Sequence, residues 1–264
     1  MRTLFDLKPM VIGALLLPEL GRPGNFRAMA WLEDFVSQNL KIFADAGFPA
    51  MMIQDLTPNP SLARPETIAI MSALCRFARQ EFPQLMLGTI IQAHDPSGAL
   101  AIAHASGASF VRIKVFVGAM VKADGIEQGC GIEARDFRRT LGREDIKILA
   151  DVHDRTGFPL GGVPIETASQ WAVYTGADAL ILTGMSYQGS LQYVQTVRNA
   201  GIQRPLVLGG SATAENIAEV FRYYDGVIVS TALRATGAAP DEIIQWDQEK
   251  VQRFMDAARR AAGQ

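Results

Sequence analysis

Short apolar runs alternate with longer amphipathic stretches along the whole chain. Each run has the length of a buried strand and is rich in valine, isoleucine, leucine or methionine, which favours β-structure. Because the runs are almost continuously apolar, they predict a parallel sheet that is covered by helices. We predict strands over residues 10–17, 50–54, 85–91, 109–116, 146–152, 178–183, 205–208 and 225–230.

The stretches between these runs have the spacing of amphipathic helices, and several end at a glycine. Gly47, Gly107 and Gly176 stand at such joints, because glycine readily adopts the left-handed conformation that closes a helix. Repeated strand and helix units without a linker favour one (β/α)8 TIM barrel over residues 1–264. A doubly wound open sheet is the alternative. We predict helices over residues 30–44, 65–82, 97–106, 133–141, 165–174 and 214–223.

Composition and charge narrow the class of partner. With 25 Lys and Arg against 27 Asp and Glu residues, the net charge is −2, so no field of one sign favours nucleic acid or an anionic membrane. Small-molecule chemistry is therefore the expectation. Cys75 and Cys130 lack the spacing of a disulfide framework or a metal site. Because no apolar run is long enough to span a bilayer, we expect a cytoplasmic protein.

Glycine and hydroxyl residues follow the last two predicted strands. The segments are GGSAT, which comprises Gly209, Gly210, Ser211 and Thr213, and Ser230 with Thr231. In many barrels the loops after the seventh and eighth strands bind a phosphate group through backbone N–H groups, and glycine lets the backbone approach the anion. The segments therefore predict a phosphate or other oxyanion site. The structural alternative is a tight glycine turn with Thr213 as a helix cap.

Two cations share one face of the fourth predicted strand. Arg112 and Lys114 are two residues apart, so their side chains point the same way, while apolar neighbours point to the helix layer. Both cations are thus expected inside the barrel, where an unpaired charge is costly. Substrate clamping is one interpretation, and for Lys114 proton transfer or Schiff-base chemistry is another. For Arg112, an internal ion pair with Asp151 is the alternative.

Asp151 and His153 share one face of the fifth predicted strand. Such a pair can bind a divalent metal ion, or the carboxylate can orient an imidazole that acts as a general acid or base. Asp55, after the second strand, and His94 with Asp95, after the third, would converge with this pair in a barrel. Metal binding, acid–base chemistry and structural pairing all stay open, because the spacing is not diagnostic.

The segment 118–131, after the fourth predicted strand, is punctuated by glycine and is expected to be a long loop. Loops of this length in compact domains are often lids or binding loops, although a mobile surface loop is the alternative. Asp124, Glu127 and Glu133 are its candidate ligands or acids. Cys130 has no histidine nearby in sequence and is a poor candidate for a nucleophile.

Several long phrases of the chain are distinctive, namely residues 8–21, DLTPNP (55–60), residues 99–129, ILADVH (148–153) and LVLGGSATAENI (206–217). Through these phrases the chain resembles the BtpA family, also called SgcQ-like, essentially from end to end. The resemblance implies a TIM barrel of the phosphate-binding type. The naming member of the family is associated with accumulation of photosystem I proteins, whereas relatives accompany sugar-uptake or catabolic genes, which implies a general metabolic activity. In this chain, Lys114 stands where the family usually has a smaller amide, and Ser230 where it usually has glycine.

The resemblance also suggests site residues and two functions. The first function is a lyase, isomerase or hydrolase that acts on an anionic sugar or nucleoside derivative. The second is a noncatalytic biogenesis or regulatory factor whose barrel binds a ligand or partner. Inward ionisable groups favour the enzyme, because a scaffold does not need their desolvation cost. In either case we expect a homo-oligomer. The positions carried over are Asp55, Arg112, Asp124, Glu133, Asp151, His153, Gly209 and Ser211.

Overall fold

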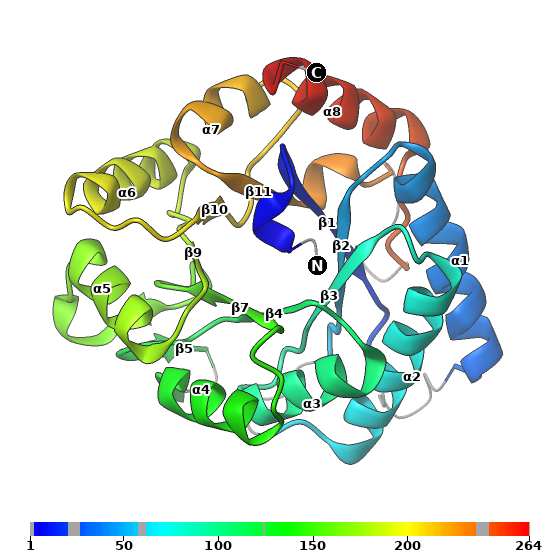
Figure 1. The fold of residues 1–264 in the computed structure, drawn as a ribbon, viewed down its shortest axis with the longest axis horizontal. Coiled ribbons are helices and arrows are strands. Elements are labelled where there is room, and N and C mark those ends of the chain that lie inside the picture. Colours follow the sequence, from blue (N-terminus) through cyan, green and yellow to red (C-terminus); the bar gives the residue numbers. More distant parts are fainter. Residues whose placement is uncertain (1–2, 21–26, 58–61, 124, 236–242, 264) are drawn as a thin grey trace.

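A closed barrel of eight parallel strands forms the centre of the protein, with strand order β1-β11-β10-β9-β7-β4-β3-β2 (Figure 1). The computed structural model describes residues 3–20, 27–57, 62–123, 125–235 and 243–263. The predicted TIM barrel is confirmed, and each barrel strand lies within one of the predicted ranges. The strands are β1 Met10–Leu16, β2 Ala50–Gln54, β3 Met86–Ile90, β4 Phe110–Ile113, β7 Lys147–Asp151, β9 Ala179–Ile181, β10 Leu206–Leu208 and β11 Gly226–Val229.

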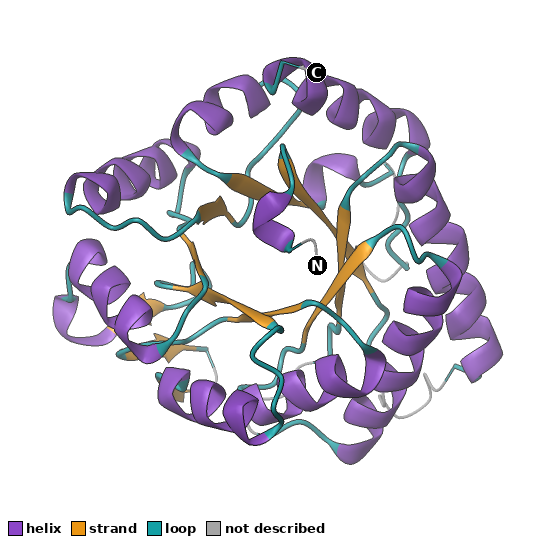
Figure 2. Ribbon diagram, viewed as in Figure 1, coloured by secondary structure: helices purple, strands orange, loops and turns teal. Residues whose placement is uncertain are grey.

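Helices form a ring around the strands (Figure 2). Two of them, α6 and α8, lie outside the ranges that we predicted. Helix α6 begins after Ser186, whose hydroxyl accepts a hydrogen bond from the Gly189 N–H. Because glycine disfavours helix, Gly189 in the first turn makes the sequence of this segment look like a loop, and no helix was predicted there. Within the described residues, no helix is both long and apolar enough to cross a membrane. The helices are α1 Met29–Asp45, α2 Pro65–Glu81, α3 Pro96–Ser106, α4 Gly131–Thr140, α5 Ile165–Thr175, α6 Tyr187–Asn199, α7 Ile217–Tyr223 and α8 Gln248–Ala261.

The barrel interior is packed with apolar side chains below its mouth. Every residue of β1 is buried, which explains its continuous apolar sequence. Phe110 lies two residues before Arg112 on the same face of β4 and is fully buried. Gly88 on the neighbouring strand makes room for it, because a Cβ atom there would lie 2.2 Å from the Phe110 ring. The lower barrel is therefore a core, and not a channel.

A short 3-10 helix, η1 Leu4–Asp6, precedes the first strand and packs against it. Leu4 and Leu7 are buried there, and Figure 1 shows the N-terminal segment across the centre of the barrel. Because η1 leads into β1, it covers the N-terminal ends of the strands. Side chains that carry chemistry are therefore expected at the opposite end, as is general for this fold.

A small antiparallel sheet stands beside the barrel. It is formed by β5 Ala119–Lys122, β6 Gly125–Gln128 and the two-residue β8 Phe158–Pro159, in the order β6-β5-β8. The prediction of one long loop over 118–131 is therefore wrong, since most of this segment is a hairpin. Pairing of β5 with β8 fixes the segment after β4 against the segment after β7.

Candidate functional site

A cavity of about 480 Å³ opens at the C-terminal ends of the strands, and we call it the mouth cavity. Its volume is within the range of small-molecule sites, roughly 300–1,000 Å³. Ala14, Leu16 and Ile90 supply apolar lining from β1 and β3, and polar residues come from the ends of other strands. The structure brings most of the predicted site residues to this cavity, namely Arg112, Lys114, Gly209, Gly210, Ser211, Thr213, Ser230 and Thr231.

Positive charge is in excess around the mouth cavity. Four cationic side chains, Arg112, Lys114, Arg155 and Arg234, line it together with the single acidic side chain of Asp154. Only Arg112 among these cations forms an ion pair with a carboxylate of the described residues. A concave site with surplus cations raises the local concentration of anions. The cavity is therefore suited to a negatively charged ligand.

Arg112 forms a bidentate pair with Asp151 inside the barrel. The Arg112 Nε lies 2.7 Å from Asp151 Oδ2, and Nη2 lies 2.9 Å from Oδ1. The pair forms because Arg112 is in register with Leu149, so that Asp151 stands two residues further along the same face of β7. Burial raises the pKa of Asp151, and the guanidinium opposes that rise. Burial also opposes the charge of Arg112, but Asp151 raises its pKa, and the arginine stays charged.

Lys114 follows the end of β4, and its ammonium group donates a hydrogen bond to the side-chain oxygen of Gln92. Burial lowers the pKa of Lys114; Asp154 opposes this shift, and the charges of Lys122 and Arg112 add to it. The proton of Lys114 is thus held by a neutral amide, and not by a carboxylate. The amine is more easily deprotonated than an exposed lysine.

Asp55, a predicted catalytic residue, lies below this contact with an exposed fraction of 1%. Its carboxylate accepts hydrogen bonds from the Thr57 N–H at 2.8 Å and from the Gln92 N–H at 3.4 Å. Burial raises the pKa of Asp55, and those hydrogen bonds oppose the rise. Asp55 does not line the mouth cavity, and it fixes the backbone of Gln92, which in turn contacts Lys114.

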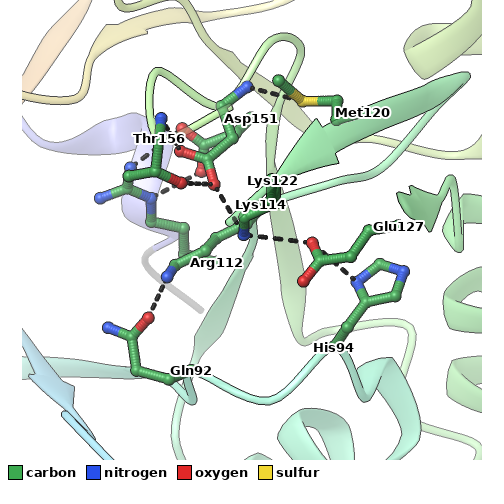
Figure 3. Close-up of polar contacts among 10 residues, drawn as sticks. Gln92, His94, Arg112, Lys114, Met120, Lys122, Glu127, Asp151 and Thr156 are labelled. Atoms are coloured by element: carbon green, nitrogen blue, oxygen red, sulfur yellow. Dashed lines mark hydrogen bonds and ion pairs between the residues drawn. The ribbon is translucent and has the colours of Figure 1, made fainter. Parts of the chain in front are cut away.

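A second charged group connects the hairpin to the mouth (Figure 3). Lys122 Nζ lies 3.1 Å from Glu127 Oε2 and 3.3 Å from Asp154 Oδ2. Asp154 also accepts hydrogen bonds from the N–H and hydroxyl of Thr156, at 3.1 and 2.6 Å. Burial alone would raise the pKa of Asp154, but these contacts hold that pKa below its usual range. His94 completes the group, with Nδ1 4.0 Å from Glu127 Oε2.

The two glycines after β10 allow a close approach of this loop to its neighbours. The Gly209 N–H donates to the Thr183 hydroxyl at 3.0 Å, and a Cβ atom at Gly209 would lie 2.6 Å from that same oxygen. A Cβ atom at Gly210 would lie 3.0 Å from the Arg155 guanidinium. The loops after β7 and β10 thus meet across the mouth. Neither glycine has a positive φ, and tight packing explains Gly209, whereas Gly210 contacts only the end of a flexible side chain.

Ser211 has a φ of 66°, and it is the only non-glycine residue with a positive φ in the described part of the chain. Its carbonyl accepts a hydrogen bond of 2.9 Å from the Asn216 side chain, whose oxygen in turn accepts from the Thr213 N–H at 2.8 Å. The Thr213 hydroxyl accepts from the N–H groups of Glu215 and Asn216. Thr213 therefore stabilises the turn that leads into α7, whose N-cap residue is Asn216 and not Thr213 as the structural alternative predicted. These bonds hold Ser211 in a conformation that costs about 1–2 kcal/mol.

Two buried polar atoms beside the mouth cavity lack a hydrogen-bond partner. They are Ser230 Oγ and Arg234 Nε, and neither has a partner within the residues that the structure describes. They flank the 3-10 helix η3 Thr231–Leu233, and the Arg234 carbonyl is fixed by Lys250 Nζ at 2.9 Å. Burial lowers the pKa of Arg234. A buried polar atom without a partner costs about 1–3 kcal/mol, which a ligand would offset by bonding to it.

The remaining predicted residues are not brought to the mouth cavity. Because β7 ends at Asp151, the alternation stops there, and the His153 ring instead packs against Tyr193 of α6 with a centroid distance of 6.4 Å. Burial lowers the pKa of His153. Glu133 is exposed in the first turn of α4 and accepts a hydrogen bond from Ser97 at 3.0 Å. Asp124 lies outside the described residues.

The donor set for a divalent metal ion is sparse. Over the described residues, no group of three or more His, Cys, Asp or Glu side chains is arranged to hold a metal ion. Both carboxylate oxygens of Asp151 accept hydrogen bonds from Arg112, and His153 packs against another element. A metal ion bound by Asp151 and His153 would require both side chains to give up these contacts.

Three residues that line the mouth cavity, and Thr183 beside it, had no clear signal in the sequence. Arg155 and Arg234 follow strand ends in irregular segments, where no periodicity tells which way a side chain points. Thr183 and Gln92 are single polar residues at the ends of β9 and β3, and they act through hydrogen bonds to Gly209 and Lys114. The one available signal was position, because residues just after a barrel strand face the mouth.

The chain is similar to proteins of one family along almost its whole length. The model of the BtpA family matches residues 7–260. An uncharacterized protein of Thermococcus kodakarensis is 28% identical over 262 residues, which cover 97% of each chain. The photosystem I biogenesis protein BtpA of Synechocystis is 28% identical over 253 residues, which cover 94% of this chain and 86% of the relative.

Solved structures with the same fold include two with low sequence identity. One is described as a native KDPGal structure; it has a TM-score of 0.60 and 15% identity, and the match covers 96% of each chain. Another is described as a 4-hydroxy-2-oxoglutarate and 2-dehydro-3-deoxyphosphogluconate aldolase; it has a TM-score of 0.56 and 15% identity, and covers 98% of this chain and 96% of its own. At such identity the likeness supports the fold alone.

Proposed function

The chain belongs to the BtpA family, and from this premise and the chemistry of its mouth cavity we propose that it is an enzyme acting on an anionic small metabolite. A phosphorylated sugar or nucleoside derivative is the preferred substrate class. The chemistry is of the lyase, isomerase or hydrolase type and depends on proton transfer. Structural neighbours described as aldolases have the same fold, although a shared fold does not define a reaction.

One observation carries this proposal: the side of the mouth after β10 and β11 has polar groups without protein partners. Ser230 Oγ and Arg234 Nε are buried without a hydrogen bond among the described residues, and Ser211 is held beside them at a positive φ. Strain and unsatisfied polar atoms cluster where a ligand is bound. An oxyanion would accept hydrogen bonds from both unpaired donors and offset the excess positive charge.

The two sides of the cavity suggest a division of roles. The phosphate group would bind between the Gly210–Thr213 loop and Ser230, and Arg155 and Arg234 would contribute charge. The rest of the metabolite would extend toward Lys114 and Asp154, which are the titratable groups on the opposite wall. Asp154 is ionised, because its pKa is held below the usual range, and it contributes a fixed negative charge. Arg112 is engaged by Asp151 and would act as a fixed positive charge.

A thermal-shift panel tests the proposal. It contains phosphosugars, phosphonucleosides, the matching unphosphorylated compounds and divalent ions. A ligand that binds the folded state raises the midpoint according to RT ln(1+[L]/Kd). We expect stabilisation by phosphorylated compounds, and a loss of that response in Arg234→Met. The matched control is Arg222→Met. Arg222 is exposed on α7, so this substitution removes the same charge at a position away from the mouth cavity.

The outcomes separate the alternatives. If no anion shifts the wild-type midpoint, or if Arg234→Met and Arg222→Met respond alike, the anion site is refuted. Stabilisation by divalent ions that Asp151→Asn removes would support the predicted metal. Stabilising compounds are then incubated with the protein and followed by NMR. Binding without conversion would favour the second candidate, a noncatalytic factor, for which the near full-length likeness to a protein named for photosystem I biogenesis is the supporting observation.

A further inference from the structure

Two lysines of the charged cluster in Figure 3 have opposite surroundings. Lys122 is paired with two carboxylates, Glu127 at 3.1 Å and Asp154 at 3.3 Å. The two carboxylates raise the pKa of Lys122, although burial acts in the opposite direction. Lys114 donates to the neutral side chain of Gln92, and no ion pair joins it to a carboxylate of the described residues. Burial lowers its pKa. Two neighbouring ammonium groups are therefore prepared for different tasks.

Lys114 is also the lysine that the mouth cavity exposes to a ligand. Among the described lining residues it is the only lysine, and it stands on the wall across from Ser211 and Ser230. It lines a second, smaller cavity of about 20 Å³ as well, together with Gln92, His94 and Glu127. A space of this size with polar groups on part of its wall holds about one water molecule. The Lys114 amine thus lies between an anion-accepting space and a water-sized polar space.

We propose that Lys114 is a nucleophile that forms an imine with a carbonyl carbon of the substrate, so that the substrate class is an anionic aldehyde or ketone. This inference rests on the proposed function, since the anion site would direct the carbonyl group toward Lys114. A lysine that serves as a nucleophile must lose its proton readily, and a buried lysine beside other cations does so.

The step balances without an added reactant. The Lys114 ammonium first releases a proton to solvent, and the neutral amine attacks the carbonyl carbon, which forms a C–N bond. One hydrogen then moves from nitrogen to the former carbonyl oxygen, and a proton from solvent allows that oxygen to leave as water. The product is a protonated imine, and overall one ammonium and one carbonyl give one iminium and one water. The small cavity lined by Gln92 and Glu127 offers a place for that water.

A simpler role for Lys114 is that of a fixed charge that attracts the anion. Lysine binds phosphate as a point charge, and this role needs neither a neutral amine nor a carbonyl in the ligand. The variant Lys114→Arg separates the two roles, because arginine keeps the positive charge but does not form an imine. Lys41 serves as an internal reference for the reactivity of a surface lysine, since its side chain is 68% exposed on α1.

Reductive trapping tests the proposal. The protein is incubated with pyruvate, glyoxylate or dihydroxyacetone phosphate and then with borohydride, whose hydride reduces the iminium to a stable secondary amine. Peptide mass spectrometry locates the adduct. Lactate and glycerol phosphate are the controls without a reactive carbonyl. Because burial lowers the pKa of Lys114, a larger fraction of its amine is neutral, and we expect several-fold more adduct on Lys114 than on Lys41, which lies outside the mouth cavity.

Each outcome decides between the two roles. Saturable labelling of Lys114 that inorganic phosphate inhibits, with no labelling at residue 114 in Lys114→Arg, supports the imine. Labelling of Lys114 no stronger than that of Lys41 overturns it. If phosphorylated compounds still shift the wild-type and Lys114→Arg midpoints in that case, the proposed function stands and only the imine fails. If no anion shifts the midpoint and no adduct forms, both fail.

Discussion

On one side of the mouth, β4, β7 and the segments that follow them carry ion pairs, and only Lys114 and Arg155 among their described cations at the cavity have no carboxylate partner. On the other side, the segments after β10 and β11 carry glycines, hydroxyls and an arginine without a carboxylate partner in the described structure. Arg112 with Asp151 represents the first side, and Ser230 with Arg234 represents the second. Both sides of the mouth are polar and partly buried.

The difference between the two sides indicates which polar groups stabilise the protein and which are available to a ligand. A buried charge pair must be complete in the folded protein, because a single charge left in the barrel is strongly destabilising. A buried neutral donor without a partner costs less folding free energy than a buried unpaired charge, so the protein folds without the ligand. Mutations on the β4 and β7 side should therefore change stability most, and mutations on the β10 and β11 side should change binding most.

Removal of one partner of the Arg112–Asp151 pair is expected to have the largest effect. Arg112→Leu leaves the Asp151 carboxylate, which is 2% exposed, without its partner and should lower the free energy of unfolding by about 3–5 kcal/mol. Urea denaturation measures this change. The double variant Arg112→Leu with Asp151→Leu should recover much of the loss, since no charge remains. A double variant as unstable as the single one would contradict our view of the pair.

The two adjacent glycines give the next contrast. Gly209→Val would force a side chain against the Thr183 hydroxyl and Ile181, so we expect destabilisation by about 1–3 kcal/mol. Gly210→Ala meets only the end of the exposed Arg155 side chain, which can move, and should cost less while it weakens anion binding. Denaturation midpoints and phosphate titrations of both variants are compared. Equal losses of stability would show that Gly210 is as tightly packed as Gly209.

The pH dependence of stability tests the Asp154 contacts. The pKa of Asp154 is held below its usual range, so this carboxylate contributes stability above its unfolded-state pKa of about 3.9. That stability is lost as the pH falls through the lower, folded-state pKa. Asp154→Asn should therefore give a flatter stability curve on the acid side. Denaturation at a series of pH values measures it, and an unchanged acid slope would count against the depressed pKa.

The smallest expected change in stability is at Ser211. Glycine adopts a positive φ freely, but it also increases the entropy of the unfolded chain, so Ser211→Gly should stabilise the protein by less than about 1 kcal/mol. Loss of the hydroxyl should weaken the binding of phosphate at the same time. Ala212→Gly is the control, because Ala212 is buried in the same loop and has no positive φ. Weaker folding of Ser211→Gly would mean that the serine is not strained.

The sequence predicts the barrel well because its strands are continuously apolar and its helices end at glycine. Inside regular strands it also predicts side-chain direction, as Arg112 and Asp151 show by their contact. It does so poorly beyond the strand ends: His153 leaves the predicted face because β7 stops at Asp151. Arg155 and Arg234 lie in irregular segments, and their directions depend on tertiary contacts that no local pattern encodes.

A crystal structure of the protein with tungstate, located by its anomalous scattering, tests the central claim most directly. Tungstate is an oxyanion with the tetrahedral shape of phosphate, and its position is found without assumptions about the substrate. We predict an anomalous peak between the Ser211 loop and Ser230, within hydrogen-bond distance of Ser230 Oγ and Arg234 Nε. A peak only at the opposite end of the barrel, or none at the mouth under saturating tungstate, would contradict the proposed anion site.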